Sequence, residues 1–148
     1  MLGVILEIRG RSSEAERAYE QVLEANPTAA VAANNLAWLY AERGANLDVA
    51  LRRAQEAKRQ LTDNPKVNDT LGWVYYKKGM ISEAVTALCE SIDRDPSDPQ
   101  AQFHAGLALL KNGDLLRARQ ALERALALDA NFENAADTRA ALSRLGSS

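Results

Sequence analysis

The segment Thr70–Gly79 reads TLGWVYYKKG, and related segments stand one fixed step before and after it. Its last glycine, Gly79, lies 35 residues after Gly44 and 34 before Gly113, while Gly10 lies 34 before Gly44. Small residues keep the same period before and after these glycines, at Gly3, Ala37, Gly72, Gly106, Ala15, Ala50, Ala84 and Ala118. A period of this length indicates one supersecondary unit stacked on copies of itself.

Each unit has the pattern of two helices joined by a short turn. Apolar residues recur at helical spacing up to the glycine, and a second helical pattern then runs to a proline or an equivalent. The glycine suits the left-handed conformation that ends many helices. One extra residue in the second unit falls between Gly44 and Ala50, in the turn, where insertions are tolerated. No segment alternates with a period of two, so we expect an all-α protein.

The composition and the net charge limit the kinds of partner and the locations that we expect for this chain. The 148 residues include 20 acidic and 18 basic side chains, and a net charge of −2 gives no reason to expect a nucleic-acid partner. No apolar run reaches the roughly 18 residues of a membrane span, so direct membrane insertion is not expected. Met1–Ile8 lacks the features of a signal peptide and has the pattern of half a helix. We therefore expect a fragment of a longer protein, and a cytoplasmic or a periplasmic location stays open.

The residues that usually carry chemistry are scarce. Cys89 and His104 are the only cysteine and histidine, so neither an internal disulfide nor a zinc set can be assembled from them. No serine or cysteine is placed for activation by His104. We expect no catalytic residue, no cofactor and no metal.

The repeated residues match a known pattern, W-x2-L-G-x2-Y, then A-x3-F, then P, with a period of 34 residues. The third unit satisfies it at Leu71, Gly72, Tyr75, Ala84, Leu88 and Pro96. The chain resembles the tetratricopeptide repeat family over essentially its whole length. It departs from the pattern where Ala33, Asn68 and Gln102 replace the leading tryptophan.

The resemblance implies an α-α superhelix, a solenoid of helix-turn-helix repeats that ends in a capping helix. We expect one domain over residues 1–148, with a truncated repeat at 1–29, repeats at 30–64, 65–98 and 99–132, and a capping helix at 133–145. One repeat cannot bury its apolar face alone, so neighbours stack around a concave side.

In this family the first helix of each pair lines the concave face, which implies a protein or peptide partner. The binding residues that we expect there are Asn34, Asn35, Trp38, Asp69, Thr70, Trp73, Tyr76, Phe103 and His104. Side-chain amides can bond a peptide backbone, and indoles provide large rigid contact areas. Trp38 and Trp73 each follow the small motif residue, and two environments stay open for them: the concave surface, or packing against neighbouring helices. Tyr40 and Tyr75 are expected in the core.

The predicted function is a non-enzymatic scaffold that holds an extended or helical partner segment in the concave groove. The alternative is a structural module that oligomerises through its terminal helices, since a truncated first helix would leave Leu2, Ile5 and Leu6 uncovered. The alanine-rich repeats look bacterial or archaeal, and a fragment of a bacterial protein is the expectation. The segments NNLAWLYAERG and TLGWVYYKKG are similar in sequence to segments of repeat proteins from bacterial envelope and exopolysaccharide-export assemblies.

Overall fold

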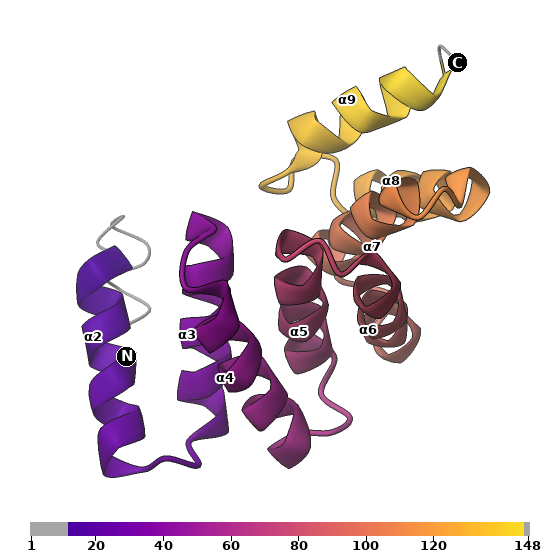
Figure 1. Cartoon of the computed structure of the whole chain (residues 1–148). Helices are drawn as coiled ribbons and strands as arrows, with labels where there is room; N and C mark the ends of the chain where they lie inside the picture. The colour runs from indigo at the N-terminus through magenta and orange to yellow at the C-terminus, as the bar shows by residue number, and fades with distance from the viewer. Residues whose placement is uncertain (1–11, 147–148) are drawn as a thin grey trace.

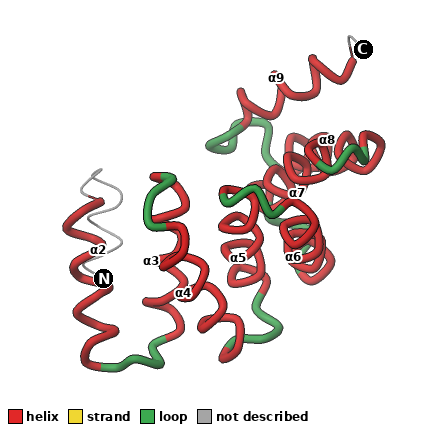
Figure 2. The backbone as a smooth tube through the Cα atoms, in the orientation of Figure 1, coloured by secondary structure: helices red, strands yellow, loops and turns green. Residues whose placement is uncertain are grey.

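Figure 1 shows the computed structural model of the chain, in which residues 12–146 are described. They form α2 (Ser12–Ala25), α3 (Ala30–Arg43), α4 (Leu47–Gln60), α5 (Pro65–Lys77), α6 (Ile81–Arg94), α7 (Pro99–Lys111), α8 (Leu115–Leu128) and α9 (Ala135–Gly146). Only helices and loops occur between residues 12 and 146, as Figure 2 shows, so the expected all-α class is confirmed. The expected half-helix at Met1–Ile8, with Leu2, Ile5 and Leu6, lies outside the described residues.

The periodic glycines end the first helix of each pair. Gly44, Gly79 and Gly113 have φ values of 67°, 80° and 83°, the left-handed region that glycine enters without steric cost. The amide of the residue after each glycine donates to the carbonyl five residues earlier, at 2.9–3.2 Å, which closes the helix end. The extra residue of the second unit is also accommodated here, because Asn46 adopts a left-handed φ of 55°.

The small motif residues mark the closest approach between paired helices. A Cβ atom added at Gly72 would lie 2.5 Å from Cγ of Leu88, and one at Gly106 would lie 2.6 Å from Cδ2 of Leu122. Both leucines are fully buried. The facing alanines of the second helices are also fully buried, at Ala15, Ala50, Ala84 and Ala118. The close helix packing expected from the repeat pattern is therefore present.

Two polar residues stand where the family pattern has tryptophan, and both are buried with partners. Asn68 is 0% exposed and its Oδ1 accepts a hydrogen bond from Lys58 Nζ. Gln102 is 5% exposed and its Nε2 donates to the Pro96 carbonyl at 3.1 Å. These hydrogen bonds replace part of the bonding to water, while Nδ2 of Asn68 is buried without a hydrogen-bond partner among the described residues.

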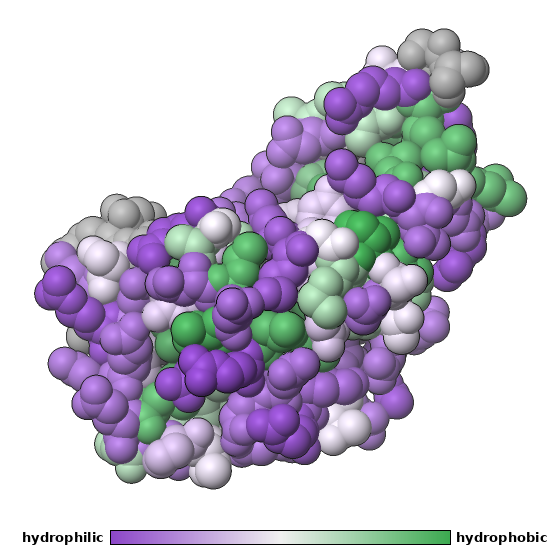
Figure 3. All heavy atoms as spheres, viewed as in Figure 1, coloured by the Kyte–Doolittle hydropathy of each residue, from purple (hydrophilic) through white to green (hydrophobic). Residues whose placement is uncertain are grey.

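The helix pairs follow one another along the array, and their first helices form one side of it. Helix α5 contacts both α3 and α7, and α9 follows at the end, packed on α8. The outline in Figure 3 is hollowed between the N-terminal helices and α9. Within the described part of the chain, no helix has both the length and the apolar character needed to cross a membrane.

Candidate functional site

Two adjoining hollows on the concave side form the groove. The first, called the amide hollow, has a volume of about 630 Å³ and is lined by Asn34, Asn35, Trp38, Leu39, Glu42, Lys66, Asp69, Thr70, Asp98, Gln100 and Glu133. The second, called the aromatic hollow, has a volume of about 400 Å³ and is lined by Trp38, Glu42, Trp73, Lys77, Gln100, Phe103, His104, Leu107, Glu133, Asn134, Asp137, Ala140 and Arg144. Four residues line both hollows and form the junction, namely Trp38, Glu42, Gln100 and Glu133.

Trp73 is held firmly in the groove wall. It is 6% exposed, and its Nε1 donates to Oε1 of Glu42 at 2.8 Å. Its ring stacks on Tyr76, with centroids 4.9 Å apart, and on His104, with centroids 4.1 Å apart. The Lys77 Nζ lies 5.1 Å from the centroid of the indole. Trp73 thus packs against neighbouring side chains, one of the two environments left open for it.

His104 organises a polar chain that joins α5, α7 and the loop before α9. Its Nδ1 lies 2.8 Å from Oδ1 of Asp69, and its Nε2 lies 3.2 Å from Nε2 of Gln100. The Gln100 amide also donates to Oδ1 of Asn134 at 2.8 Å. A neutral imidazole fits this arrangement, because Nδ1–H donates to the carboxylate while Nε2 accepts from the amide. His104 is 1% exposed, so nearly all of its surface is covered by neighbouring side chains.

Trp38 is the aromatic residue that the groove leaves half-buried. Its ring is tilted over His104, with centroids 5.5 Å apart, and it borders both hollows. Asn34 and Asn35 lie nearby on the same helix, also partly exposed. Oδ1 of Asn34 is buried without a hydrogen-bond partner among the described residues. A partly exposed ring beside two partly exposed side-chain amides can contact both the side chains and the backbone of a peptide.

The structure brings most of the predicted binding residues together, since Tyr76 alone among the nine lines neither hollow. Tyr76 instead supports the wall behind Trp73, where burial raises the pKa of its phenol. Phe103 is 4% exposed and packs edge-on against Phe132, with centroids 6.1 Å apart. Of the two expected core tyrosines, Tyr40 is buried and Tyr75 is partly exposed.

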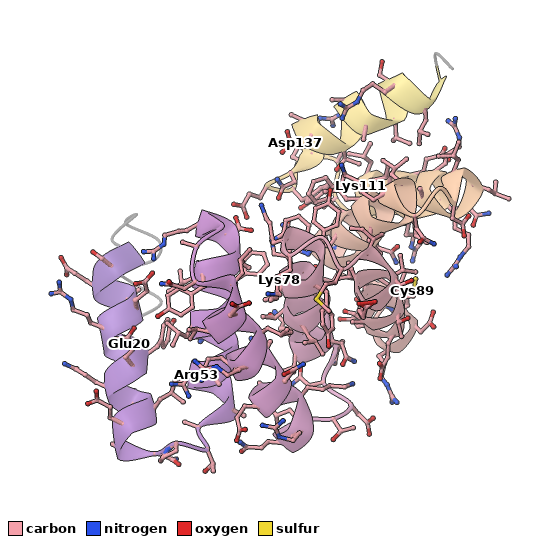
Figure 4. The ribbon with its side chains drawn as sticks, in the orientation of Figure 1. Glu20, Arg53, Lys78, Cys89, Lys111 and Asp137 are labelled. Atoms are coloured by element: carbon pink, nitrogen blue, oxygen red, sulfur yellow. The ribbon has the colours of Figure 1, made fainter. Side chains whose placement is uncertain are left out.

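Several groove residues were not among the predicted binding residues. Glu42 lies near the end of α3, Asp98 caps α7 and Glu133 precedes α9. Gln100 and Asn134 also line the groove without having been predicted as binding residues. Their spacing of 34 residues, one repeat, is a sequence signal that could have indicated their contact. Asp137, labelled in Figure 4 at the start of α9, extends the lining further.

The remaining reactive side chain lies away from the groove. Cys89 is on α6 (Figure 4), half-buried, with Arg117 Nη2 at 3.3 Å from its sulfur. Burial raises the pKa of the Cys89 thiol, which disfavours the nucleophilic thiolate. Among the described residues no cluster of histidine, cysteine and carboxylate side chains could hold a metal.

Stacked helix pairs around a concave groove define the class of helical-repeat interaction modules. The tetratricopeptide repeat family model matches residues 1–65 and 70–136, and the chain belongs to this family. Members of the family are non-enzymatic modules that bind other proteins, so the expected family and the absence of enzymatic function agree with this match.

The chain is similar to the TPR repeat-containing protein PA4667 of Pseudomonas aeruginosa, at 26% identity over 103 residues. This match covers 70% of the chain but only 17% of that relative's length. Among solved structures, the thermophilic TPR protein TTC0263 of Thermus thermophilus superposes with a TM-score of 0.81, at 24% identity, covering 97% of this chain and 77% of that one.

Another solved relative is YrrB, described as a TPR protein with an unusual peptide-binding site. It superposes with a TM-score of 0.68 at 22% identity, covering 95% of this chain and 74% of that one. These matches establish the superhelical fold. They lend no support to the expected similarity to exopolysaccharide-export proteins.

Proposed function

We propose that this chain is a scaffold that binds an extended segment of a partner protein in the groove. The observation that carries the proposal is the half-buried Trp38 at the junction of two continuous hollows. A rigid, partly exposed indole inside a groove is typical of residues that dominate binding energy at protein interfaces.

The polar lining supports an extended backbone as the occupant. A peptide strand carries unpaired N–H and C=O groups, and these need partners once they leave water. Asn34 and Asn35 line the amide hollow and are partly exposed, so their side-chain amides can pair with the N–H and C=O groups of a peptide backbone. The peptide-binding site attributed to the related YrrB is consistent with this proposal.

The test is selection of peptides from a displayed random dodecapeptide library on the immobilised chain, followed by affinity measurements. Trp38→Ala and Asn35→Ala should each weaken binding of the selected peptides by about tenfold or more. Leu116→Ala and Asn131→Ala are matched controls, because both residues are exposed and lie outside the groove. Equal affinities in all four variants, with unchanged circular dichroism, would place the binding site elsewhere.

Self-association through the terminal helices is the alternative function. The helix expected at the N-terminal end of the array lies outside the described residues. At the C-terminal end, α9 packs on α8. Sedimentation velocity over a concentration series separates the two functions. A monomer that retains peptide binding supports the scaffold, whereas a dimer disrupted by changes in α9 supports assembly.

A further inference from the structure

The groove carries an excess of negative charge at its amide hollow. Four carboxylates line this hollow, and the ammonium group of Lys66 is the one basic side chain among its lining residues. The carboxylates belong to Glu42, Asp69, Asp98 and Glu133. Such an imbalance in a concave site raises the local concentration of cations and of cationic side chains.

The partners of these carboxylates differ, and this difference locates the uncompensated charge. Asp98 is the N-cap of α7, and its Oδ1 accepts a hydrogen bond from the backbone N–H of Gln100 at 3.0 Å. The helix dipole favours an anion at this position. Asp69 faces His104. The one hydrogen bond that Glu42 accepts from a described side chain comes from a neutral group, the indole N–H of Trp73. Glu133 is exposed, and the ion pairs of the described residues include neither glutamate.

The two glutamates without a cationic partner among residues 12–146 both lie at the junction, beside Trp38. Each of these three residues borders the amide and the aromatic hollow. An indole face attracts a cation placed over it, and carboxylates bind guanidinium and ammonium groups through charge-assisted hydrogen bonds. The junction thus combines an aromatic surface with two anionic acceptors.

We propose that the junction binds a cationic side chain of the partner segment, with arginine preferred over lysine. This proposal rests on the proposed peptide-binding function and names the chemistry of its central contact. Arginine is preferred because its planar guanidinium can stack on the Trp38 indole while its N–H groups reach Glu42 or Glu133.

The aromatic hollow explains why the cation is placed at the junction and not further along the groove. That hollow alone includes the basic side chains Lys77 and Arg144, which disfavour a second cation in that part of the groove. Lys77 already lies over the Trp73 ring, with Nζ 5.1 Å from the centroid. A partner segment would therefore place its cationic residue at the junction and uncharged residues beside Lys77.

The experiment compares peptides selected by the unaltered chain and by the Glu42→Gln/Glu133→Gln variant from the same random dodecapeptide library. Glutamine keeps an oxygen that can accept the Trp73 indole N–H, so the wall is preserved while the charge is removed. Glu83→Gln/Glu123→Gln is the matched control, since both residues are exposed, lie outside the groove, and change the net charge equally.

Arginine should be enriched at one fixed position in the peptides selected by the unaltered chain and by the control, but not by the junction variant. Replacing that arginine with citrulline should weaken binding to the unaltered chain by about tenfold and leave binding to the junction variant nearly unchanged. Lysine replacement should cause a smaller loss.

Two contrary outcomes are distinguishable. Peptides that require Trp38 but show no cationic enrichment, or an enrichment that survives in the junction variant, would overturn the cation proposal and leave the peptide groove intact. Selected peptides whose affinity does not depend on Trp38 or Asn35 would overturn the proposed function itself.

Discussion

His104 Nδ1 lies 2.8 Å from Oδ1 of Asp69, and this contact joins α7 to α5 at the wall of the groove. The two residues stand 35 positions apart and belong to successive helix pairs. The imidazole also stacks on Trp73 of α5. One buried side chain thus joins two repeats through a hydrogen bond and a ring contact, and its ring also lies against Trp38 of α3.

Removing the acceptor in this contact should destabilise the array. Asp69→Ala leaves the buried Nδ1–H group of His104 unpaired, and such a loss costs about 1–3 kcal/mol. Asp69→Asn keeps a side-chain oxygen that can accept the same hydrogen bond, so its cost should be smaller. Urea unfolding followed by circular dichroism measures both. Equal losses in the two variants would show that the hydrogen bond is not what stabilises this contact.

The approach of Gly72 to Leu88 makes a second prediction. In Gly72→Ala the new Cβ would meet Leu88 side-chain atoms at 2.5 and 2.7 Å and the Leu88 backbone nitrogen at 3.1 Å. Overpacking of this kind costs about 1–3 kcal/mol, which exceeds the gain of about 1 kcal/mol in helix propensity from replacing glycine by alanine. Gly72→Leu should be more damaging still. Thermal unfolding of both variants measures the loss.

A double-mutant cycle identifies the cause of that loss. Leu88→Ala removes the atoms that the new Cβ would meet, so Gly72→Ala should cost less in that background. Gly79→Ala provides a contrast, because no atom lies within 4 Å of its added Cβ and its cost comes from a φ of 80°. Strict additivity of Gly72→Ala and Leu88→Ala would contradict the assigned contact.

Truncation of the two tryptophans should affect different properties of the protein, namely stability for Trp73 and peptide affinity for Trp38. Trp73→Ala removes a buried ring stacked between Tyr76 and His104 and should lower stability by about 3–5 kcal/mol. Trp38→Ala removes a partly exposed ring and should mainly weaken peptide binding. Urea unfolding and peptide affinity are measured on both variants. A Trp73→Ala protein as stable as the parent would contradict the buried position.

Stability at high pH should depend on Tyr40. Burial, together with its 2.8 Å hydrogen bond to Glu20, raises the pKa of Tyr40 from 10 to about 12. The unfolded chain loses this proton first, so the stabilisation is complete below pH 10 and disappears as the pH rises towards 12. The free energy of unfolding should therefore fall more steeply in this range for the parent than for Tyr40→Phe. Parallel pH profiles would contradict the prediction.

Protection from hydrogen exchange should follow the number of neighbouring helices. Helix α5 contacts α3, α4, α6 and α7, whereas α9 packs on α8, so the backbone amides of Leu71–Tyr75 should exchange most slowly and those of Asp137–Leu145 fastest. Mass spectrometry of deuterium uptake measures both segments, and uniform exchange would indicate a single cooperative globule.

Backbone geometry was predictable because it depends on local sequence. Gly44, Gly79 and Gly113 end helices where the sequence predicts, since glycine alone enters the left-handed region freely and the period repeats it. The expected capping helix at 133–145 appears as α9, Ala135–Gly146, with its start displaced by two residues. Helix ends are the least certain part of such predictions, because terminal hydrogen bonds depend on the following loop.

The sequence by itself determined the helix pairs, their turns and the close contacts at Gly72 and Gly106, because these depend on residues within one repeat. Only the tertiary structure decided that Trp38 stays partly exposed while Trp73 is buried. Trp38 and Trp73 hold equivalent places in their repeats, but His104 stacks on Trp73, while the residue equivalent to His104 one repeat earlier is the smaller Thr70. The packing of neighbouring repeats therefore determines the surface of the groove, which a single repeat cannot specify.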